Sequence, residues 1–385
     1  MFNNNLITKF NTLETPFYYY DLNLLENTLK ALVNSKYNNF YIHYAIKANN
    51  NNEIIKRIKK FDLGIDAVSG NEIIKALDLD FDPKKIVFSG VGKTQNEIQI
   101  GVRNNIYSFN CESLHEIELI NIISKKLNRK SNIAIRLNPN IDSHSHKYMK
   151  TAISDSKFGI QISDLPLFID RINQFDNVSL IGFHFHIGSQ LTDLDVFLKL
   201  SKIANDINLY FKENNILIKD INLGGGLGID YGEPDKNLIP NFNKYFDIFK
   251  KELKLYKNQK IHFELGRSIV GQSGTLVSKV LYIKKSFNKK FIIIDAGMTE
   301  LIRPALYNSH HHIQNLMSDS ILKKYDIVGP LCESSDTFIK DFYLNKTKIN
   351  DLLAIRSVGA YGEVMSSNYN LRKKASSYYS DSIFE

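Results

Sequence analysis

The chain alternates between short apolar strands and helices that carry capping signals at their starts. Eight segments of strand-like composition recur between residues 41 and 265, and a helical pattern follows most of them. Several helices begin with Ser or Thr followed three residues later by Glu, at Ser69, Thr94 and Ser113, where we expect reciprocal capping boxes. The predicted strands are residues 41–47, 63–69, 86–90, 106–110, 133–138, 180–187, 220–224 and 261–265.

An eightfold repeat of strand, turn and capped helix is what a (β/α)8 barrel requires. Such barrels typically take about 250 residues, and the predicted region has a similar length. An open doubly wound sheet would preserve the same alternation and is the alternative. We therefore predict an α/β fold whose cofactor-binding domain is a (β/α)8 barrel over residues 21–265.

After Gly266 the sequence changes to longer β-rich runs with fewer helical periods. Four strands are predicted there, at residues 276–283, 291–295, 325–328 and 352–358. The segment Thr15 to Tyr20, which precedes the barrel, is another strand candidate. We predict a second, all-β domain made of residues 1–20 and 266–385, with the N-terminal strand joining it.

Composition narrows the functional classes. With 43% apolar and 23% charged residues the chain resembles an ordinary globular enzyme, and no stretch approaches the ~18 apolar residues that span a bilayer. The formal charge of +8 is spread along the chain, which argues against a nucleic-acid partner. Two cysteines, Cys111 and Cys332, are too few for a disulfide framework. We expect a cytoplasmic protein.

Reactive side chain types collect at the ends of the predicted strands. In a barrel of this kind the active site lies at the carboxyl ends of the strands. A lysine at one strand end is usually just solvated, so the whole group of strand-end residues is stronger evidence for a site than any one of them. The strand-end residues are Lys47, Asp66, Arg136, His184, His186 and Glu264.

Three of these features together describe a pyridoxal phosphate site. Lys47 supplies an amine that can bind an aldehyde, and the run Gly224–Gly228 offers backbone N–H groups to a phosphate. Glu264 can hold a proton on a heterocyclic nitrogen through a charge-assisted hydrogen bond worth roughly 1.5 to 3 kcal/mol. Separately, the glycines could form only a tight turn and Glu264 could pair with Arg267 at the surface; in combination they favour pyridoxal phosphate.

The histidines do not predict a metal site. His184 and His186 alternate along one strand and so share a face, but they would need a third ligand. The triplet His310–His312 cannot supply it readily, because adjacent side chains point in different directions. His186 is better suited to form a wall against a planar cofactor.

With these residues in place, the chain resembles the alanine-racemase-like barrel family of pyridoxal-phosphate decarboxylases, and within it the branch that acts on meso-diaminopimelate. The resemblance runs from about Pro16 to Arg372. Its motifs are YAIKAN at 44–49, KFGI at 157–160, HFHIGSQ at 184–190, GGGLG at 224–228, ELGR at 264–267, DAGM at 295–298, LIRPALY at 301–307, GPLCESSD at 329–336, GAYG at 359–362 and SSNYN at 366–370.

The resemblance implies that Lys47 binds the cofactor covalently, His186 stacks on its ring and Glu264 pairs with the ring nitrogen. Asp66 and Arg136, at the ends of the second and fifth strands, are expected to complete the cofactor site. Further cofactor contacts, at or near the phosphate, are expected from Ser189, Gly225, Gly226, Gly266, Arg267 and Tyr361.

The implied reaction is the decarboxylation of meso-2,6-diaminopimelate to L-lysine. A substrate with a distal carboxylate needs a cation and a donor, which Arg303 and Tyr307 can supply. Ornithine and arginine, the alternative substrates, have no such carboxylate. The resemblance adds Arg267 and Tyr361 as substrate contacts, with Glu333 for the distal ammonium.

Members of this family are usually homodimers in which a Cys-Glu loop reaches the neighbouring site. Cys332 and Glu333 would then act across the dimer, with Cys332 as the catalytic proton donor and Lys47 as the other candidate. A racemase on the same barrel and an inactive cofactor-binding regulator remain as further readings.

Four positions depart from the usual family pattern. Leu265 replaces a common proline and is expected to hold Glu264 loosely, and Ala152 stands where Thr-Gly is usual. Asn350 and Ser335 each replace a glycine. The tail after Asn370 is short and divergent, which raises a question about the stability of the β domain.

Overall fold

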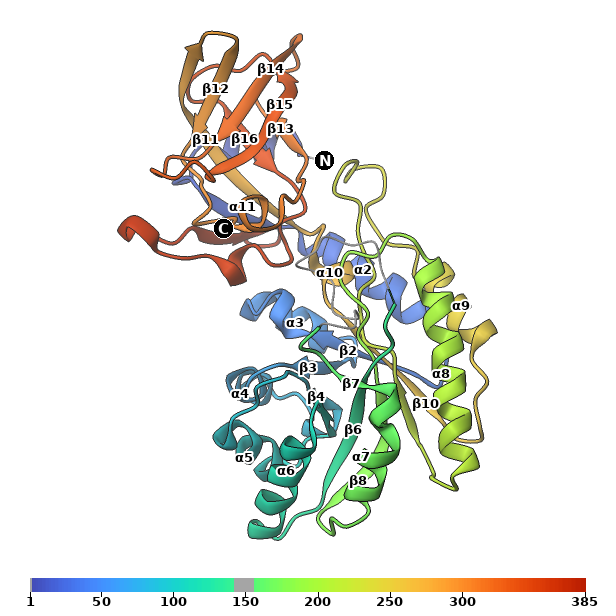
Figure 1. The fold of residues 1–385 in the computed structure, drawn as a ribbon. Coiled ribbons are helices and arrows are strands. Elements are labelled where there is room, and N and C mark those ends of the chain that lie inside the picture. Colours follow the sequence, from blue (N-terminus) through green and yellow to red (C-terminus); the bar gives the residue numbers. More distant parts are fainter. Residues whose placement is uncertain (1, 142–155) are drawn as a thin grey trace.

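The structure is a computed structural model that describes residues 2–141 and 156–385. Two sheets organise these residues, one in each half of the molecule (Figure 1). Ala152, one of the unusual positions, lies outside the described residues.

Eight parallel strands close into the predicted barrel. The order is β5-β4-β3-β2-β10-β9-β8-β6, and pairing of β5 with β6 closes the ring. This closure excludes the open doubly wound sheet, because an open sheet would leave both edge strands unpaired. The strands are β2 (Phe40–Ala45), β3 (Gly64–Ala67), β4 (Ile86–Phe88), β5 (Ser108–Cys111), β6 (Ser131–Asn138), β8 (Val178–His184), β9 (Asp220–Asn222) and β10 (Lys260–Leu265), with a short β7 (Ile160–Gln161) beside β6.

Amphipathic helices surround the barrel (Figure 1). Each turns apolar side chains inward, as α8 does with Val196, Phe197 and Leu200. The helices are α2 (Leu22–Ser35), α3 (Asn52–Lys59), α4 (Gly70–Asp78), α5 (Gln95–Arg103), α6 (Leu114–Lys126), α7 (Leu165–Ile172), α8 (Asp195–Glu213) and α9 (Phe242–Glu252). Short pieces α1 (Asn4–Phe10), α10 (Arg267–Val270) and α11 (Arg303–Tyr307) lie outside this ring.

One of the three predicted reciprocal capping boxes forms. Thr94 and Glu97 cap α5 in both directions. At the other two sites the serine caps its helix, but the glutamate does not return to the serine N–H. Glu72 accepts from Val68 N and Glu116 from Glu112 N, one residue earlier in each case. The prediction of reciprocity at Ser69 and Ser113 was therefore wrong, because these glutamates reach back one residue further along the chain.

The second sheet is the predicted all-β domain, and β1 (Phe17–Tyr20) joins it as expected. β1 pairs antiparallel with β11 and parallel with β17. The sheet holds β11 (Gly274–Ser286), β12 (Lys289–Ile294), β13 (Ile313–Asn315), β14 (Leu322–Val328), β15 (Thr337–Asn345), β16 (Leu352–Ile355) and β17 (Ser376–Tyr379). The domain limits 21–265 and 1–20 plus 266–385 stay a prediction.

The positions that depart from the family pattern fit the fold. Asn350 takes a φ of 70°, a left-handed conformation that asparagine tolerates better than most residues. Ser335 is exposed, so its hydroxymethyl group is solvated. Leu265 is buried, and the divergent tail is tied to β1 through β17.

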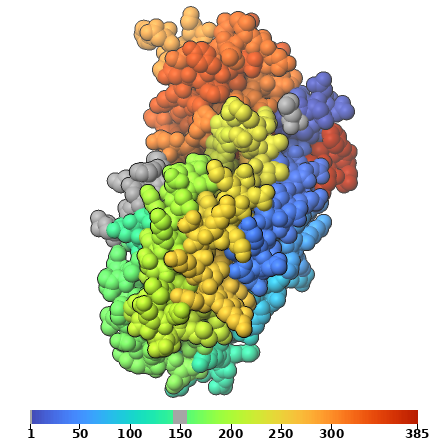
Figure 2. Space-filling view, turned by 90° about the vertical axis from the view of Figure 1, so that its right-hand side faces the viewer, coloured from blue at the N-terminus to red at the C-terminus, as the bar shows by residue number. Residues whose placement is uncertain are grey.

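The loop of residues 223–241, between β9 and α9, makes contacts from the barrel to the β domain. Asp235 in this loop pairs with Arg356 of the β domain at 2.9 Å, and His312 N donates to Tyr231 O at 3.2 Å. In the space-filling view, yellow-green residues of this part of the chain lie directly against the orange β domain (Figure 2). The barrel and the β domain therefore meet beside the glycine run that follows β9.

Candidate functional site

A cavity of about 460 Å³ opens at the carboxyl ends of the barrel strands. Four of the predicted cofactor residues line it, and so does His184. The lining residues are Lys47, Val68, Ser89, Gly90, Val91, Gly92, Lys93, Glu97, Arg136, Phe158, His184, His186 and Glu264.

Lys47 faces this cavity from a turn just past β2. The strand ends at Ala45, two residues earlier than predicted, and Lys47 lies in the 3-10 turn Ile46–Ala48. Its Nζ pairs with Asp66 Oδ2 at 2.9 Å, and Asp66 is fully buried. Burial lowers the pKa of Lys47, but Asp66, with further contributions from Tyr361 and Glu264, outweighs it and the net pKa is raised. The other carboxylate oxygen, Asp66 Oδ1, is buried without a hydrogen-bond partner among the described residues.

Glu264 is held rigidly at the end of β10. Its Oε1 accepts from Asn110 at 2.9 Å and from Asn222 at 2.8 Å, and His184 Nε2 lies 3.0 Å from Oε2. Burial alone would raise the pKa of Glu264, yet His184, together with Lys47 and His186, more than offsets it and the pKa is lowered. The expected looseness beside Leu265 is therefore wrong. A carboxylate has about four acceptor sites, so one remains for a ring N–H.

His186 lies just past β8 and faces the same cavity. The Gly225 N–H donates to His186 Nδ1 at 3.4 Å, which requires an unprotonated Nδ1. Burial, followed by the charges of Lys47 and Arg136, holds the pKa of His186 well below its usual value. Arg136 pairs with Glu112 and covers the ring of Phe158 at 4.9 Å. His186 thus presents a neutral, planar imidazole ring to the cavity.

The glycine run after β9 allows a close backbone approach. A Cβ on Gly225 would lie 2.0 Å from the carbonyl oxygen of Glu264, so no side chain fits there. Gly226 takes a φ of 106°, which favours glycine. A Cβ on Gly266 would similarly crowd Ala48, the residue after Lys47, at 2.9 Å. These three predicted residues bring the loops after β2, β9 and β10 together.

A second cluster of predicted residues surrounds Arg267. Its Nη2 donates to Ser189 Oγ at 3.0 Å, its Nη1 donates to the Tyr231 hydroxyl, and its guanidinium covers the Tyr361 ring at 4.9 Å. Tyr361 N in turn donates to Ala48 O at 2.8 Å. The guanidinium Nε is buried without a hydrogen-bond partner among the described residues. A phosphate could satisfy that donor.

Arg303 lies next to this cluster at the start of α11. Its Nη1 donates to Tyr231 OH at 2.9 Å, and the side chain is 1% exposed. Across residues 2–141 and 156–385, neither Arg267 nor Arg303 forms an ion pair with a carboxylate. Burial lowers the pKa of Arg303. Two buried guanidinium groups without carboxylate partners make a site for two anionic groups.

Two predicted residues lie apart from these clusters. Cys332 and Glu333 are exposed on the β domain, where Glu333 accepts from Tyr369 at 2.6 Å. Tyr307, at the end of α11, is half-buried. The described part of one chain therefore does not bring Cys332 to the Lys47 cavity.

Sequence reasoning missed the residues that position the predicted ones. Asn110 and Asn222 fix Glu264, and Tyr231 bridges the two arginines. Asn110 ends one predicted barrel strand and Asn222 lies within another, so a signal for both was available. Tyr231 and His311 lie in loops, where spacing gives no indication of long-range contacts.

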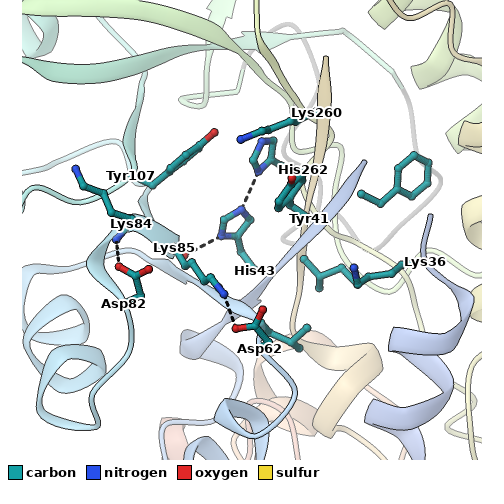
Figure 3. A pocket seen from close by; sticks show the side chains of 14 residues that line it. Lys36, Tyr41, His43, Asp62, Asp82, Lys84, Lys85, Tyr107, Lys260 and His262 are labelled. Carbon is teal, nitrogen blue, oxygen red and sulfur yellow. Dashed lines mark hydrogen bonds and ion pairs between the residues drawn. The ribbon is translucent and has the colours of Figure 1, made fainter. Parts of the chain in front are cut away.

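Another cavity, of about 300 Å³, lies at the opposite end of the barrel (Figure 3). Its lining includes the starts of β2 and β10, with Tyr41, Tyr107 and Lys260. Its buried polar groups bond one another. His43 Nδ1 contacts Lys85 O at 3.1 Å, and His43 Nε2 contacts His262 Nδ1 at 2.9 Å.

This chain of hydrogen bonds determines which ring nitrogens of His43 and His262 carry protons. His262 Nε2 lies 3.1 Å from Asp220 Oδ1, so both outer partners, Lys85 O and Asp220, can only accept. Three hydrogen bonds then need three protons on the two rings. The proton between the rings belongs to His262, next to the Asp220 carboxylate, while His43 accepts. Burial, with the His262 charge, accordingly lowers the pKa of His43 to about 3.

We expect acid to destabilise the fold through His43. The unfolded chain protonates His43 near pH 6.5, whereas the folded chain does so near pH 3. Between these values the unfolded state binds more protons, so the free energy of unfolding falls by a few kcal/mol as the pH decreases. Urea unfolding from pH 7.5 to 4.5 should show a shallower decline for His43→Gln. His115→Gln, at an exposed histidine, is the control and should keep the original slope; an unchanged slope in His43→Gln would contradict the assignment.

Within the described residues, no group of three or more His, Cys, Asp or Glu side chains is placed to hold a metal ion. No helix in the described ranges has both the length and the apolar content needed to cross a membrane.

Known proteins resemble this chain over nearly its whole length. Residues 24–271 match the family described as pyridoxal-dependent decarboxylase, pyridoxal binding domain. A diaminopimelate decarboxylase of Bacteroides thetaiotaomicron is 47% identical over 379 residues, covering 98% of each chain. One from Aquifex aeolicus is 38% identical over 367 residues, covering 94% of this chain and 86% of that one.

Solved structures agree. Diaminopimelate decarboxylase from Helicobacter pylori, complexed with L-lysine, superposes with a TM-score of 0.89 at 37% identity, covering 96% of this chain and 92% of that one. A lysine decarboxylase from Selenomonas ruminantium has a TM-score of 0.86 but is 18% identical, and it shares the fold.

Proposed function

The chain belongs to the pyridoxal-dependent decarboxylase family, and from that premise we propose that it converts meso-2,6-diaminopimelate to L-lysine and CO2. The relatives named diaminopimelate decarboxylase support this substrate. The observation that carries the proposal is Arg303, a buried guanidinium with no carboxylate partner among the described residues. Diaminopimelate keeps a second carboxylate at its far end, which can pair with Arg303.

The cofactor is pyridoxal phosphate, and the cavity residues fit it. Lys47 would hold it covalently, Glu264 would bind its ring nitrogen and His186 would cover its ring, with Asp66 and Arg136 beside them. Ser189, Gly225, Gly226, Gly266, Arg267 and Tyr361 would surround its phosphate. The buried, unpaired Nε of Arg267 and the crowded glycine backbone are the features that match an anion there. When bound, the cofactor supplies a protonated ring that accepts the electron pair left behind by CO2.

The protein groups then have separate tasks. Glu264, held ionised by His184, keeps a proton at the ring nitrogen. Arg303, with Tyr307 nearby on α11, binds the distal carboxylate, and Arg267 and Tyr361 also contact the substrate. Glu333 binds the distal ammonium. Cys332 Sγ donates a proton to the substrate carbon that has lost CO2.

We further propose a homodimer, because Cys332 and Glu333 are exposed and do not line the Lys47 cavity of their own chain. A partner's copies would complete each site. The purified protein with cofactor should sediment at twice the chain mass of 44.2 kDa. Full activity from a species of one chain mass would contradict this. We place the enzyme in the cytoplasm, where the free thiols of Cys111 and Cys332 persist.

The test is CO2 release by the purified protein with pyridoxal phosphate. Meso-diaminopimelate is compared with ornithine, arginine and lysine at equal concentrations. We expect CO2 from meso-diaminopimelate alone, in equal amount to L-lysine. Turnover of ornithine or arginine would support the alternative substrate, and no CO2 despite bound cofactor would argue against an enzyme.

A further inference from the structure

The histidine triplet separates into three environments. His310 is exposed, and the His312 ring packs against Phe342 at 6.4 Å. His311 is 3% exposed and packs edge-on against Tyr231, with ring centroids 4.9 Å apart. Only His311 of the three therefore faces the arginine cluster.

His311 is bonded on both ring nitrogens. Its Nδ1 lies 2.9 Å from Arg356 O, and its Nε2 lies 2.8 Å from Arg303 Nη1. A carbonyl can only accept and a guanidinium can only donate. Nδ1 must therefore carry the proton and Nε2 the lone pair, so His311 is neutral.

These bonds decide which edge of Arg303 stays available. Nη1 carries two hydrogens, and its two recorded acceptors are His311 Nε2 and Tyr231 OH. Nε and Nη2 make no hydrogen bond to the described residues, and together they form one flat edge with parallel donors. That edge matches the two oxygens of a carboxylate.

We propose that His311 is a positioning residue for substrate selection: it occupies Nη1 of Arg303 and thereby presents the Nε and Nη2 edge to the distal carboxylate. The inference rests on the proposed function and assigns a role within that site. Tyr231 occupies the second hydrogen of Nη1 and holds the guanidinium from the other side.

The experiment separates carboxylate recognition from folding and chemistry. His311→Leu removes the acceptor, whereas His311→Gln restores one on a side chain of similar reach. His310→Leu is the matched control at the exposed neighbour. L-Lysine, which keeps the distal carboxylate, and 1,5-diaminopentane, which lacks it, serve as competing ligands.

For His311→Leu we expect the KM for meso-diaminopimelate and the Ki of L-lysine to rise about tenfold to a hundredfold. We expect kcat to change less than about threefold, the Ki of 1,5-diaminopentane to stay within about twofold, and His311→Gln to regain most of the loss. His310→Leu should match the wild type.

An unchanged KM in His311→Leu, or equal increases in both Ki values, would overturn the proposal, because a general structural effect would weaken both ligands. If His311→Leu does not fold, Tyr231→Phe removes the other acceptor of Nη1 and is judged by the same ratio of Ki values. A wild-type protein inactive on meso-diaminopimelate would instead refute the proposed function, so the two failures are distinguishable.

Discussion

Replacing Lys47 by alanine is expected to lower kcat for meso-diaminopimelate by at least about a thousandfold. Lys47 is the one amine that lies within the cavity next to both Asp66 and the loop of Gly266, among the described residues. Without it the cofactor loses its covalent attachment. The proposed covalent attachment is what would activate the cofactor toward the substrate amine, so we expect its loss to slow the reaction.

The same substitution leaves the buried Asp66 without its cation, so stability must be separated from chemistry. Lys47→Arg keeps a positive charge beside Asp66 but cannot attach the cofactor in the same way. We expect it to be as inactive as Lys47→Ala while unfolding closer to the wild type. Borohydride should fix the cofactor to the wild type and to neither variant. Retention of more than about a tenth of the activity by Lys47→Ala would contradict this role.

The second large effect is expected at Glu264. Glu264→Gln should lower kcat by about a hundredfold to a thousandfold, the range found when a group that stabilises developing charge is removed. The amide oxygen can still accept from Asn110 and Asn222, so two of the three contacts of the carboxylate are preserved. What is lost is the negative charge that we propose keeps the ring nitrogen protonated.

Three measurements distinguish the loss of the Glu264 charge from disruption of the fold or of cofactor binding. Glu264→Gln should bind pyridoxal phosphate and should unfold at a similar urea concentration to the wild type. Glu264→Asp, which keeps the charge at a shorter reach, should retain more activity than Glu264→Gln. Equal kcat in Glu264→Gln and wild type would show that the carboxylate charge plays no part.

Acid should not titrate Glu264 within the usual carboxyl range. Despite burial, His184, Lys47 and His186 together hold the pKa of Glu264 below its ordinary value. Any loss of activity between pH 6 and pH 4 must therefore come from other groups. The fall in fold stability through His43 is one such cause.

The barrel was predictable because its signal is local and repeated. Each of the eight predicted strands overlaps an observed barrel strand, and a side-chain cap begins every helix around the barrel except α7 and α8. The β domain was predicted less completely. β13 and β17 are short, and β15 (Thr337–Asn345) mixes apolar with charged residues, so composition gave little indication of them.

The residues of the candidate site could likewise be predicted only in part. Residues at strand ends, such as Lys47 and Glu264, could be located from strand positions alone. The bridge from Arg267 through Tyr231 to Arg303 joins the starts of two short helices to a loop, and the three segments are far apart in sequence. No periodicity relates them, and only the packing of the β domain against the loop 223–241 creates the bridge.

The position of that bridge implies that substitutions affecting substrate choice and substitutions affecting the chemistry fall in different domains. Lys47 and Glu264 stand on the barrel, whereas Arg303 and His311 stand on the β domain. Substitutions that alter the preferred chain length or far-end charge of a substrate can therefore accumulate on the β domain without disturbing Lys47 or Glu264. Descendants of such a protein would be free to diverge in what they accept while inheriting the same chemistry.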